Sequence, residues 1–292
     1  MEKKKVLCLG CGMMGSLLIN AYMECGHEVA IVNRTASKAD EFVARGATYF
    51  EKLSDAIEAT GPDLIAFNFD TYETGTIYLN EAAPLIKGRI VVNLSTAAYE
   101  KVAEFQKLVE SYGGKFIVGN ITCYPKNVGP GKDGSFVFAG DKEAYEEVKD
   151  ILASLSPMNI YMGEDTIAGP TMDTVWLTVH YGLYWGLVQS AAACKVNNVS
   201  IEQYADVIKP MVTALLDLVC NNLKEIVAKD KYEVATDAKL YNQALGVGET
   251  VEYYASYGMD ASVLEAIGAL VNKEIEKGNR DKNFEIIIKS IE

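Results

Sequence analysis

The chain has 292 residues, enough for one large domain or two of ordinary size. Its 49% hydrophobic and 23% charged residues are typical of a packed globular protein rather than a disordered one. A net charge of −13 argues against a nucleic-acid partner, because phosphate binding requires clustered lysine and arginine. Six cysteines scattered through apolar segments lack the density of a disulfide framework, which favours a reducing compartment, the cytoplasm.

The most apolar stretch, residues 172–193, approaches the length that spans a bilayer. It contains Asp173, His180 and Gln189, and no second stretch of this kind exists. A helix buried inside the protein explains it better than a membrane span, so we expect no membrane contact.

The first half of the chain alternates short β-rich runs with helical periods. The segments that predict strands are 5–9, 28–32, 63–69, 89–94, 115–121, 135–139 and 159–162. The segments that predict helices are 15–25, 37–45, 53–59, 73–86, 99–112 and 142–155. Strands that alternate with helices of this length indicate βαβ units and a parallel sheet, so this half is predicted to be an α/β domain of the Rossmann type.

After Gly163 the pattern becomes helical and no strand is convincing. A long helix is predicted over 170–194, and the later helical segments are 201–228, 237–257, 261–277 and 283–291. We therefore expect two domains, residues 1–163 and residues 164–292, of which the second is all-helical. The long helix would connect them.

A glycine-rich sequence, Gly10-Cys11-Gly12-Met13-Met14-Gly15, stands directly after a predicted strand and before a predicted helix. In this context it predicts a dinucleotide-binding loop. The first glycine makes a tight turn, the second lets the backbone approach the pyrophosphate, and the third permits close helix–strand packing. The helix N-terminus offers unpaired N–H groups to the anion. We expect the cofactor to contact Gly10, Gly12, Met13, Met14 and Gly15.

The end of the second predicted strand indicates which dinucleotide is bound. NAD enzymes usually carry Asp or Glu there, which accepts a hydrogen bond from the ribose 2′-hydroxyl. This sequence has Asn33, Arg34 and Thr35, followed by Lys38. A guanidinium binds a phosphate through two hydrogen bonds, and a lysine adds a point charge. These residues predict NADPH as the cofactor; the alternative is a solvated basic loop.

Four separated groups of residues, spread over the whole chain, carry a family resemblance. They are Gly10–Gly15 with Asn33-Arg34-Thr35, Val92-Asn93-Leu94-Ser95-Thr96, Gly119-Asn120-Ile121-Thr122-Cys123-Tyr124-Pro125, and Gly169–Tyr181 with Tyr257-Gly258-Met259-Asp260. In these groups the chain resembles the imine reductases and reductive aminases, relatives of the β-hydroxyacid dehydrogenases. The resemblance implies an oxidoreductase with a Rossmann domain followed by a helical domain.

One position separates the two families. β-Hydroxyacid dehydrogenases place a lysine on the long interdomain helix, whereas this chain has no lysine between Lys149 and Lys195 and carries Asp173, which matches the imine reductases. A carboxylate attracts an iminium cation that an ammonium would repel. The carboxyl could also pass a proton to the nitrogen if burial raises its pKa. We expect cation stabilisation to be its main role.

The resemblance also implies roles for other residues. Tyr181 and Asn93 would join Asp173 as catalytic residues that position the substrate nitrogen, with Asn93 also beside the nicotinamide. The remaining residues expected to line the substrate pocket are Thr122, Cys123, Trp176, Leu177, Tyr184 and Gln243. His180 has no clear counterpart in the family and is interpreted as a packing residue. Val118 stands where the family usually has Asp, which bears on substrate preference.

The sequence thus predicts an NADPH-dependent imine reductase that gives a hydride to the carbon of a C=N bond. Its substrates would be cyclic imines, or a ketone together with an amine. The alternative enzyme is a reductase of small aldehydes or oxo acids, and a non-enzymatic alternative is an NADPH-binding redox sensor. No metal-ligand cluster is evident. Because family members exchange their helical domains, the resemblance further implies a domain-swapped homodimer.

Overall fold

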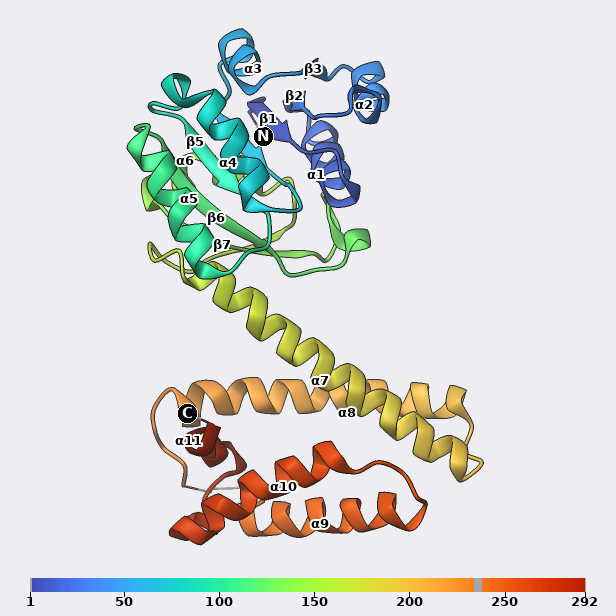
Figure 1. The fold of residues 1–292 in the computed structure, drawn as a ribbon. Helices are drawn as coiled ribbons and strands as arrows, with labels where there is room; N and C mark the ends of the chain where they lie inside the picture. The colour runs from blue at the N-terminus through green and yellow to red at the C-terminus, as the bar shows by residue number, and fades with distance from the viewer. Residues whose placement is uncertain (1, 234–237, 292) are drawn as a thin grey trace. The chain divides into compact units, whose positions relative to one another are not determined.

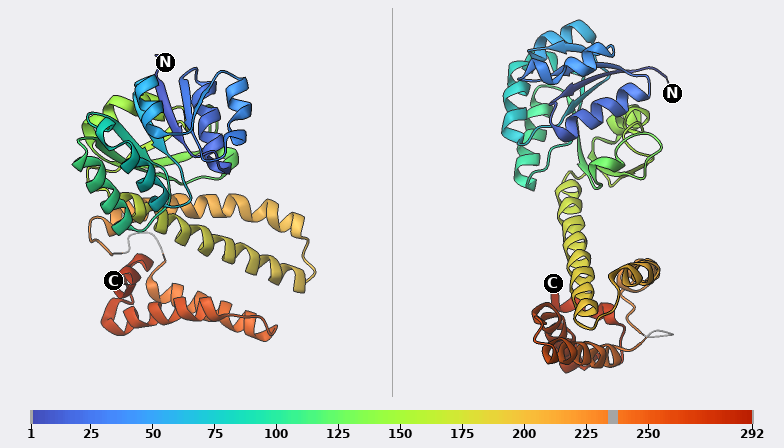
Figure 2. Two further views of the ribbon diagram at one scale, coloured as in Figure 1. Left: turned by 45° about the horizontal axis from the view of Figure 1, so that its top comes forward. Right: turned by 90° about the vertical axis from the view of Figure 1, so that its right-hand side faces the viewer.

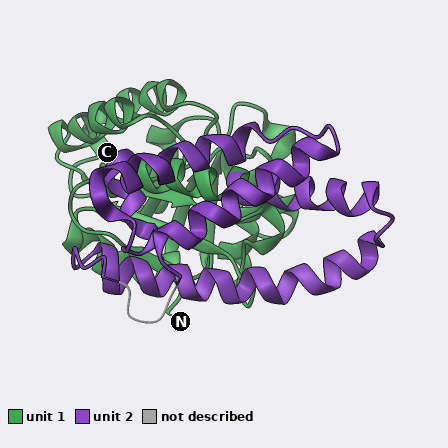
Figure 3. Cartoon of the chain, turned by 90° about the horizontal axis from the view of Figure 1, so that it is seen from below, with its two compact units in different colours: residues 1–181 green, residues 182–292 purple. Residues whose placement is uncertain are grey.

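The computed structural model describes residues 2–233 and 238–291. The chain forms two compact units, Met1–Tyr181 and Gly182–Glu292, and the division between them falls inside one long helix (Figures 1 and 3). Each unit has hydrophobic clusters of its own.

The first unit is built on an eight-stranded sheet with the strand order β3-β2-β1-β4-β5-β6-β7-β8. The order of its first six strands is that of the dinucleotide-binding α/β fold. The strands are β1 (Lys5–Leu9), β2 (Glu28–Val32), β3 (Thr48–Phe50), β4 (Leu64–Phe67), β5 (Ile90–Asn93), β6 (Lys115–Ile121), β7 (Ser135–Gly140) and β8 (Met158–Tyr161). The predicted fold class, a Rossmann domain followed by a helical domain, is confirmed.

The sheet is parallel except at one pair, β6 and β7, which run antiparallel. The predicted parallel sheet thus contains one antiparallel pair. A parallel neighbour needs a crossover across one face of the sheet, usually a helix. The chain between β6 and β7 is loop 122–134, which holds only a 3-10 turn, η3 (Pro125–Asn127), and therefore returns directly.

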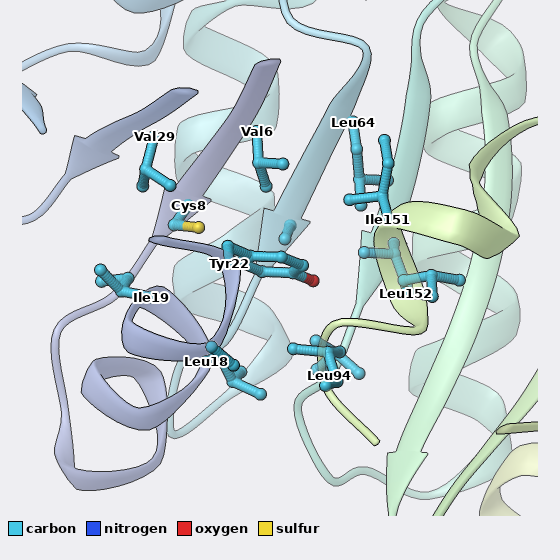
Figure 4. Packing of buried hydrophobic residues seen from close by; sticks show 14 of the residues in the cluster. Val6, Cys8, Leu18, Ile19, Tyr22, Val29, Leu64, Leu94, Ile151 and Leu152 are labelled. Carbon is cyan, nitrogen blue, oxygen red and sulfur yellow. The ribbon is translucent and has the colours of Figure 1, made fainter. Parts of the chain in front are cut away.

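Helices cover both faces of this sheet (Figures 1 and 2). Alternate residues of β1 divide between two clusters, because successive side chains of a strand point to opposite faces. Val6 and Cys8 pack with α1 (Met13–Glu24) and α6 (Lys142–Leu152), as Figure 4 shows. Leu7 and Leu9 belong to the opposite cluster. The helices that contribute to that cluster are α3 (Leu53–Thr60), α4 (Tyr72–Glu81) and α5 (Tyr99–Ser111).

The segment after β2 differs most from the sequence prediction. The predicted helix over 37–45 is a 3-10 turn, η1 (Ala36–Lys38), followed by the short α2 (Asp40–Ala44). Residues Thr48–Phe50 form the edge strand β3, which the sequence pattern does not predict. Three residues are too few for an alternation of apolar and polar side chains to be recognised.

The second unit is helical, as expected. The long helix α7 (Ala168–Val196) leads into it. The first unit also contains a 3-10 turn, η2 (Ala83–Leu85), after α4. The later elements are α8 (Ile201–Asn222), η4 (Leu223–Val227), α9 (Leu240–Ser256), α10 (Ser262–Glu274), η5 (Ile275–Asn279), η6 (Phe284–Ile287) and α11 (Ile288–Ile291). The predicted start of the α9 segment, Asp237, lies outside the described residues. None of the described helices is long and apolar enough to cross a membrane.

His27 joins three parts of the first unit inside the core. Its Nδ1 atom lies 3.3 Å from the backbone nitrogen of Lys4, and its Nε2 atom lies 3.0 Å from the Ser154 hydroxyl. Because a backbone N–H can only donate, Nδ1 must accept, so Nε2 carries the hydrogen and donates to Ser154. The folded protein therefore requires the neutral imidazole, and burial lowers the pKa of His27.

This histidine predicts a loss of stability in mild acid. The unfolded chain takes up a proton near pH 6.5, whereas the folded chain resists it until the pH reaches the lowered pKa. The contribution of His27 is thus present above pH ~6.5 and declines as the pH falls through that window. Thermal unfolding between pH 5.5 and 7.5 should show a steeper decline for the wild type than for His27→Gln. Parallel curves would contradict this assignment.

Candidate active site

A cavity of about 800 Å³ opens in the first unit at the carboxyl ends of β1, β2, β4 and β5. This edge of a doubly wound sheet is where α/β folds bind ligands. The cavity brings together eight of the residues that the sequence assigns to the cofactor: Gly10, Gly12, Met13, Met14, Asn33, Arg34, Thr35 and Lys38. Gly15 and Asn93 are not among the residues that line it.

The three glycines of the loop have different surroundings. Gly10 has a φ of +100°, and a Cβ there would lie 2.2 Å from the Asn68 carbonyl oxygen. A Cβ on Gly15 would lie 2.1 Å from the Gly10 carbonyl oxygen, so this glycine serves the packing of α1 against the loop. Gly12 has open space beside it and is the N-cap of α1 without a side-chain cap. Its backbone is therefore accessible to an anionic group such as a pyrophosphate.

Asn33 at the end of β2 fixes the glycine loop from inside the protein. Its Oδ1 atom accepts a hydrogen bond from the Cys11 backbone N–H at 3.0 Å, and its Nδ2 atom donates to the Thr35 carbonyl at 2.8 Å. Although Asn33 lines the cavity, both polar atoms of its side chain are thus engaged in hydrogen bonds with the protein backbone. Arg34 and Lys38, which follow, are exposed at the cavity and present the positive charge there.

Asp173 lies in the second turn of α7 and is half-buried. Burial raises the pKa of its carboxyl above the ordinary value, while a hydrogen bond from Thr96 opposes this shift. Thr96 itself lines the cavity, so the carboxyl is linked to the cavity wall. The beginning of α7 is held against β6, because a Cβ on Gly169 would lie 2.5 Å from Oδ1 of Asn120.

Asn93 is fully buried at the end of β5. Its Oδ1 atom accepts a hydrogen bond from the Ser95 backbone N–H at 3.0 Å, and its Nδ2 atom has no partner among the described residues. Asn93 pairs in register with Val118, and Asn120 lies two residues further along β6 on the same face. Oδ1 of Asn120 is also buried without a described partner. Buried polar atoms of this kind gain stability when a ligand or water binds them.

Residues 5–163 match the family model of the NAD binding domain of 6-phosphogluconate dehydrogenase. This chain belongs to that family. Residues 165–292 match a second model, the C-terminal domain of NADPH-dependent reductive aminase-like proteins. In this dehydrogenase family, the glycine loop and the basic residues after β2 are therefore parts of a dinucleotide-binding domain.

Similar proteins agree with these matches. The chain is 24% identical to an NADPH-dependent reductive aminase of Aspergillus oryzae, over 98% of this chain and 96% of that protein. An imine reductase of Myxococcus stipitatus in complex with NADP+ has the same fold, with a TM-score of 0.85, 20% identity and coverage of 99% of this chain and 100% of that one. The predicted resemblance and the oxidoreductase class are thereby confirmed, and both of these relatives are named with the NADP cofactor that the sequence predicts.

A further relative is named as a nuclear factor and not as a reductase. The cytokine-like nuclear factor N-PAC of Xenopus tropicalis is 25% identical over 86% of this chain. This chain spans 47% of that protein, so the match concerns about half of its length.

The cavity also includes residues that the sequence does not single out. Asn68, Phe69 and Asp70 follow β4, and Thr74, Ile77 and Tyr78 lie on α4. The rings of Phe69 and Tyr78 stack with their centroids 5.1 Å apart, which gives the cavity an apolar wall. These residues carry no motif. They reach the site because β4 lies beside β1, which brings its loop next to the glycine loop.

The residues expected in the substrate pocket are not all brought together. Thr122 and Cys123 lie beyond the cavity lining at the start of loop 122–134, where the Thr122 hydroxyl is 2.8 Å from the Ser135 hydroxyl. Burial raises the pKa of the Cys123 thiol, and it raises the pKa of Cys11 to about 11. Deprotonation to the reactive thiolate is therefore disfavoured at both cysteines. Tyr184 and Gln243 belong to the second unit. Their role stays a prediction.

The expected site residues of α7 that follow Trp176 are exposed. Trp176 is half-buried, whereas Leu177 is 42%, Tyr181 65% and Tyr184 63% exposed. His180, interpreted from the sequence as a packing residue, makes a polar contact: its Nδ1 atom lies 3.1 Å from the Tyr124 hydroxyl. The sequence likewise does not predict that Tyr124 contacts His180.

Proposed function

We propose that this protein is an NADPH-dependent imine reductase that transfers a hydride to the carbon of a C=N bond. The observation that carries the proposal is the half-buried Asp173 carboxyl, linked to the cavity wall through Thr96, on a helix where no lysine occurs between Lys149 and Lys195. A negative group at this place favours a cationic electrophile and offers no cation to a developing alkoxide.

The cavity fits the dinucleotide. Gly12 leaves the N-terminus of α1 open to the pyrophosphate, and Arg34 and Lys38 are placed to bind a 2′-phosphate. When bound, NADPH supplies the hydride. Asn33 holds the loop through Cys11, so the shape of the site is established by the protein itself.

The side chains of this protein would then act on the substrate nitrogen. The ionised Asp173 carboxylate stabilises and orients the iminium cation, and because burial raises its pKa the protonated form can also give up a proton to the nitrogen. Tyr181 and the unpartnered Nδ2 atom of Asn93 would position the nitrogen or a water molecule. Substrates would be cyclic imines, or a ketone with an amine.

One panel of assays tests the function. NADPH oxidation is measured with a cyclic imine such as a 1-pyrroline, with a ketone plus an amine, and with small aldehydes and oxo acids. We expect turnover of the imine. Turnover restricted to aldehydes or oxo acids would establish the alternative reductase, and tight NADPH binding without turnover of any of them would establish a sensor.

We further propose that the protein is a homodimer in which the partner covers α8. None of the 22 residues of this helix is buried within its own chain, although it carries many large apolar side chains. These include Val207, Met211, Leu215, Leu216, Leu218 and Val219. An exposed apolar surface of this extent is typical of a permanent protein–protein interface. The exchange of helical domains expected from the resemblance stays a prediction.

The dimer can be tested by sedimentation at micromolar concentration. The wild type should sediment at about twice its chain mass of 31.9 kDa. Leu215→Glu places a charge on the apolar face of α8 and should shift the protein toward monomer. Lys107→Glu on the exposed face of α5 is the matched control and should remain dimeric. A wild-type monomer would rule the dimer out.

The cysteines support the expected reducing compartment. All six are free thiols, including the two that stand three residues apart, Cys8 and Cys11. Burial raises the pKa of both, which disfavours thiolate chemistry at this pair. We infer a cytoplasmic location on this ground.

A further inference from the structure

Four aromatic rings meet between loop 122–134 and α7. His180 is at the centre, with its ring centroid 5.9 Å from that of Tyr124, 5.8 Å from that of Trp176 and 5.0 Å from that of Tyr181. The contacts with Tyr124 and Tyr181 are edge-to-face, which is a favourable arrangement for aromatic pairs. The Tyr124 hydroxyl also lies 3.1 Å from Nδ1 of His180.

This cluster connects two segments that both carry candidate pocket residues. Loop 122–134 begins with Thr122 and Cys123, immediately before Tyr124. Elsewhere the loop is tied to the first unit by the Gly129 backbone N–H, which donates to the Leu155 carbonyl at 2.8 Å. Tyr124 is the residue that ties the first part of the loop to α7.

His180 shares a face of α7 with the proposed catalytic groups. Trp176 and His180 stand three and seven residues after Asp173, a spacing that places them on one side of a helix. Tyr181 is 65% exposed, so packing within the chain does little to fix its ring. Among the described residues, the aromatic ring that it contacts is that of His180.

We propose that Tyr124 and His180 form a latch that anchors loop 122–134 to α7 and fixes the ring of Tyr181, so that His180 is a positioning residue for the reduction. The hydroxyl–imidazole hydrogen bond sets the position of the imidazole, and the T-shaped contact with the imidazole sets the position of the Tyr181 ring. This inference rests on the proposed function for its effect on turnover, whereas the latch itself is independent of it.

A double-mutant cycle tests the effect on catalysis. Tyr124→Phe removes one hydroxyl, and His180→Phe keeps a ring of similar size but removes the hydrogen bond. One hydrogen bond of this kind corresponds to about three- to tenfold in a rate. Each variant should lower kcat for the cyclic imine by about that factor, while the KM for NADPH and the melting temperature stay unchanged. The double variant should be no slower than either single variant.

Tyr99→Phe is the matched control. Tyr99 is an exposed tyrosine at the start of α5, outside the cavity lining, and its replacement should leave kcat unchanged. Additive losses in the double variant, or a fall in melting temperature that accounts for the loss of activity, would overturn the positioning role.

Histidine NMR tests the latch without any turnover. The chain has two histidines, so the ring nitrogen signals of His180 and His27 can be assigned with one variant. In Tyr124→Phe the Nδ1 signal of His180 should shift, while the signals of His27, bonded to Lys4 and Ser154, should not. An unchanged His180 signal would overturn the latch. A shifted signal in a protein that reduces no imine would overturn the proposed function and leave the latch standing.

Discussion

Replacing Asp173 with asparagine is expected to lower the turnover of a cyclic imine by roughly two to three orders of magnitude. Asparagine keeps the size of the side chain and can still bond to the Thr96 hydroxyl, so only the negative charge is lost. Because Thr96, and not Asp173, lines the cavity, NADPH affinity should change by less than about threefold. Single-turnover kinetics and NADPH titration separate the two effects.

The pH dependence gives a second, independent expectation for this residue. Burial raises the pKa of Asp173, so the carboxylate that holds the cation is lost at a pH above the ordinary value of about 4. Activity should therefore decline on the acid side through the raised pKa, and Asp173→Asn should abolish that limb. If the carboxyl acted mainly as the proton donor, activity would instead fall as the pH rises through the same pKa.

Stability separates a catalytic effect from misfolding. A carboxyl with a raised pKa stabilises the fold below its ordinary pKa and loses that contribution as the pH rises through the folded value. At neutral pH the ionised Asp173 thus destabilises the fold, and Asp173→Asn should unfold at the same temperature as the wild type or at a slightly higher one. Asp150→Asn on the exposed surface of α6 serves as the control. Full activity in Asp173→Asn would refute the proposed role.

The sequence brings the glycine loop and the residues after β2 to one cavity correctly, because the information that places them is local. The glycines and the residues after β2 are contiguous, and their chemistry follows from backbone geometry and charge. The sequence pattern assigns Asn33 to the cofactor but does not reveal that its side-chain amide bonds to Cys11 and Thr35. A side chain's internal partners depend on which loops meet, and the spacing of residues does not encode that.

The other side of the site could not be predicted from motifs. Phe69, Thr74 and Tyr78 enter the cavity only because β4 is placed beside β1, and residues of these types also occur in any helix or loop. The contact between Tyr124 and His180 joins residues 56 positions apart and leaves no periodic signal. The reversal of direction between β6 and β7 similarly depends on the path of loop 122–134.

Replacing Arg34 with alanine is expected to weaken NADPH binding by about 10- to 100-fold and NADH binding by less than about threefold. A hydrogen bond between charged groups contributes about 1.5–3 kcal/mol, and the two cofactors differ only in the 2′-phosphate. Arg34 is exposed at the cavity, which Lys38 also lines, and the residue directly after β2 is the neutral Asn33. Because this position does not carry a carboxylate, its side chain does not repel the phosphate.

The preference for NADPH over NADH should also depend on the salt concentration and on Lys38. Raising the ionic strength screens exposed charges, so the affinity of the wild type for NADPH should fall more steeply than its affinity for NADH. Lys38→Ala should reduce NADPH affinity less than Arg34→Ala, because a lysine offers a point charge without the paired hydrogen bonds of a guanidinium. Lys107→Ala removes a distant positive charge and should change neither affinity. Equal losses for both cofactors in Arg34→Ala would mean that the arginine binds a part they share, such as the adenine ring, and that the preference for NADPH arises elsewhere.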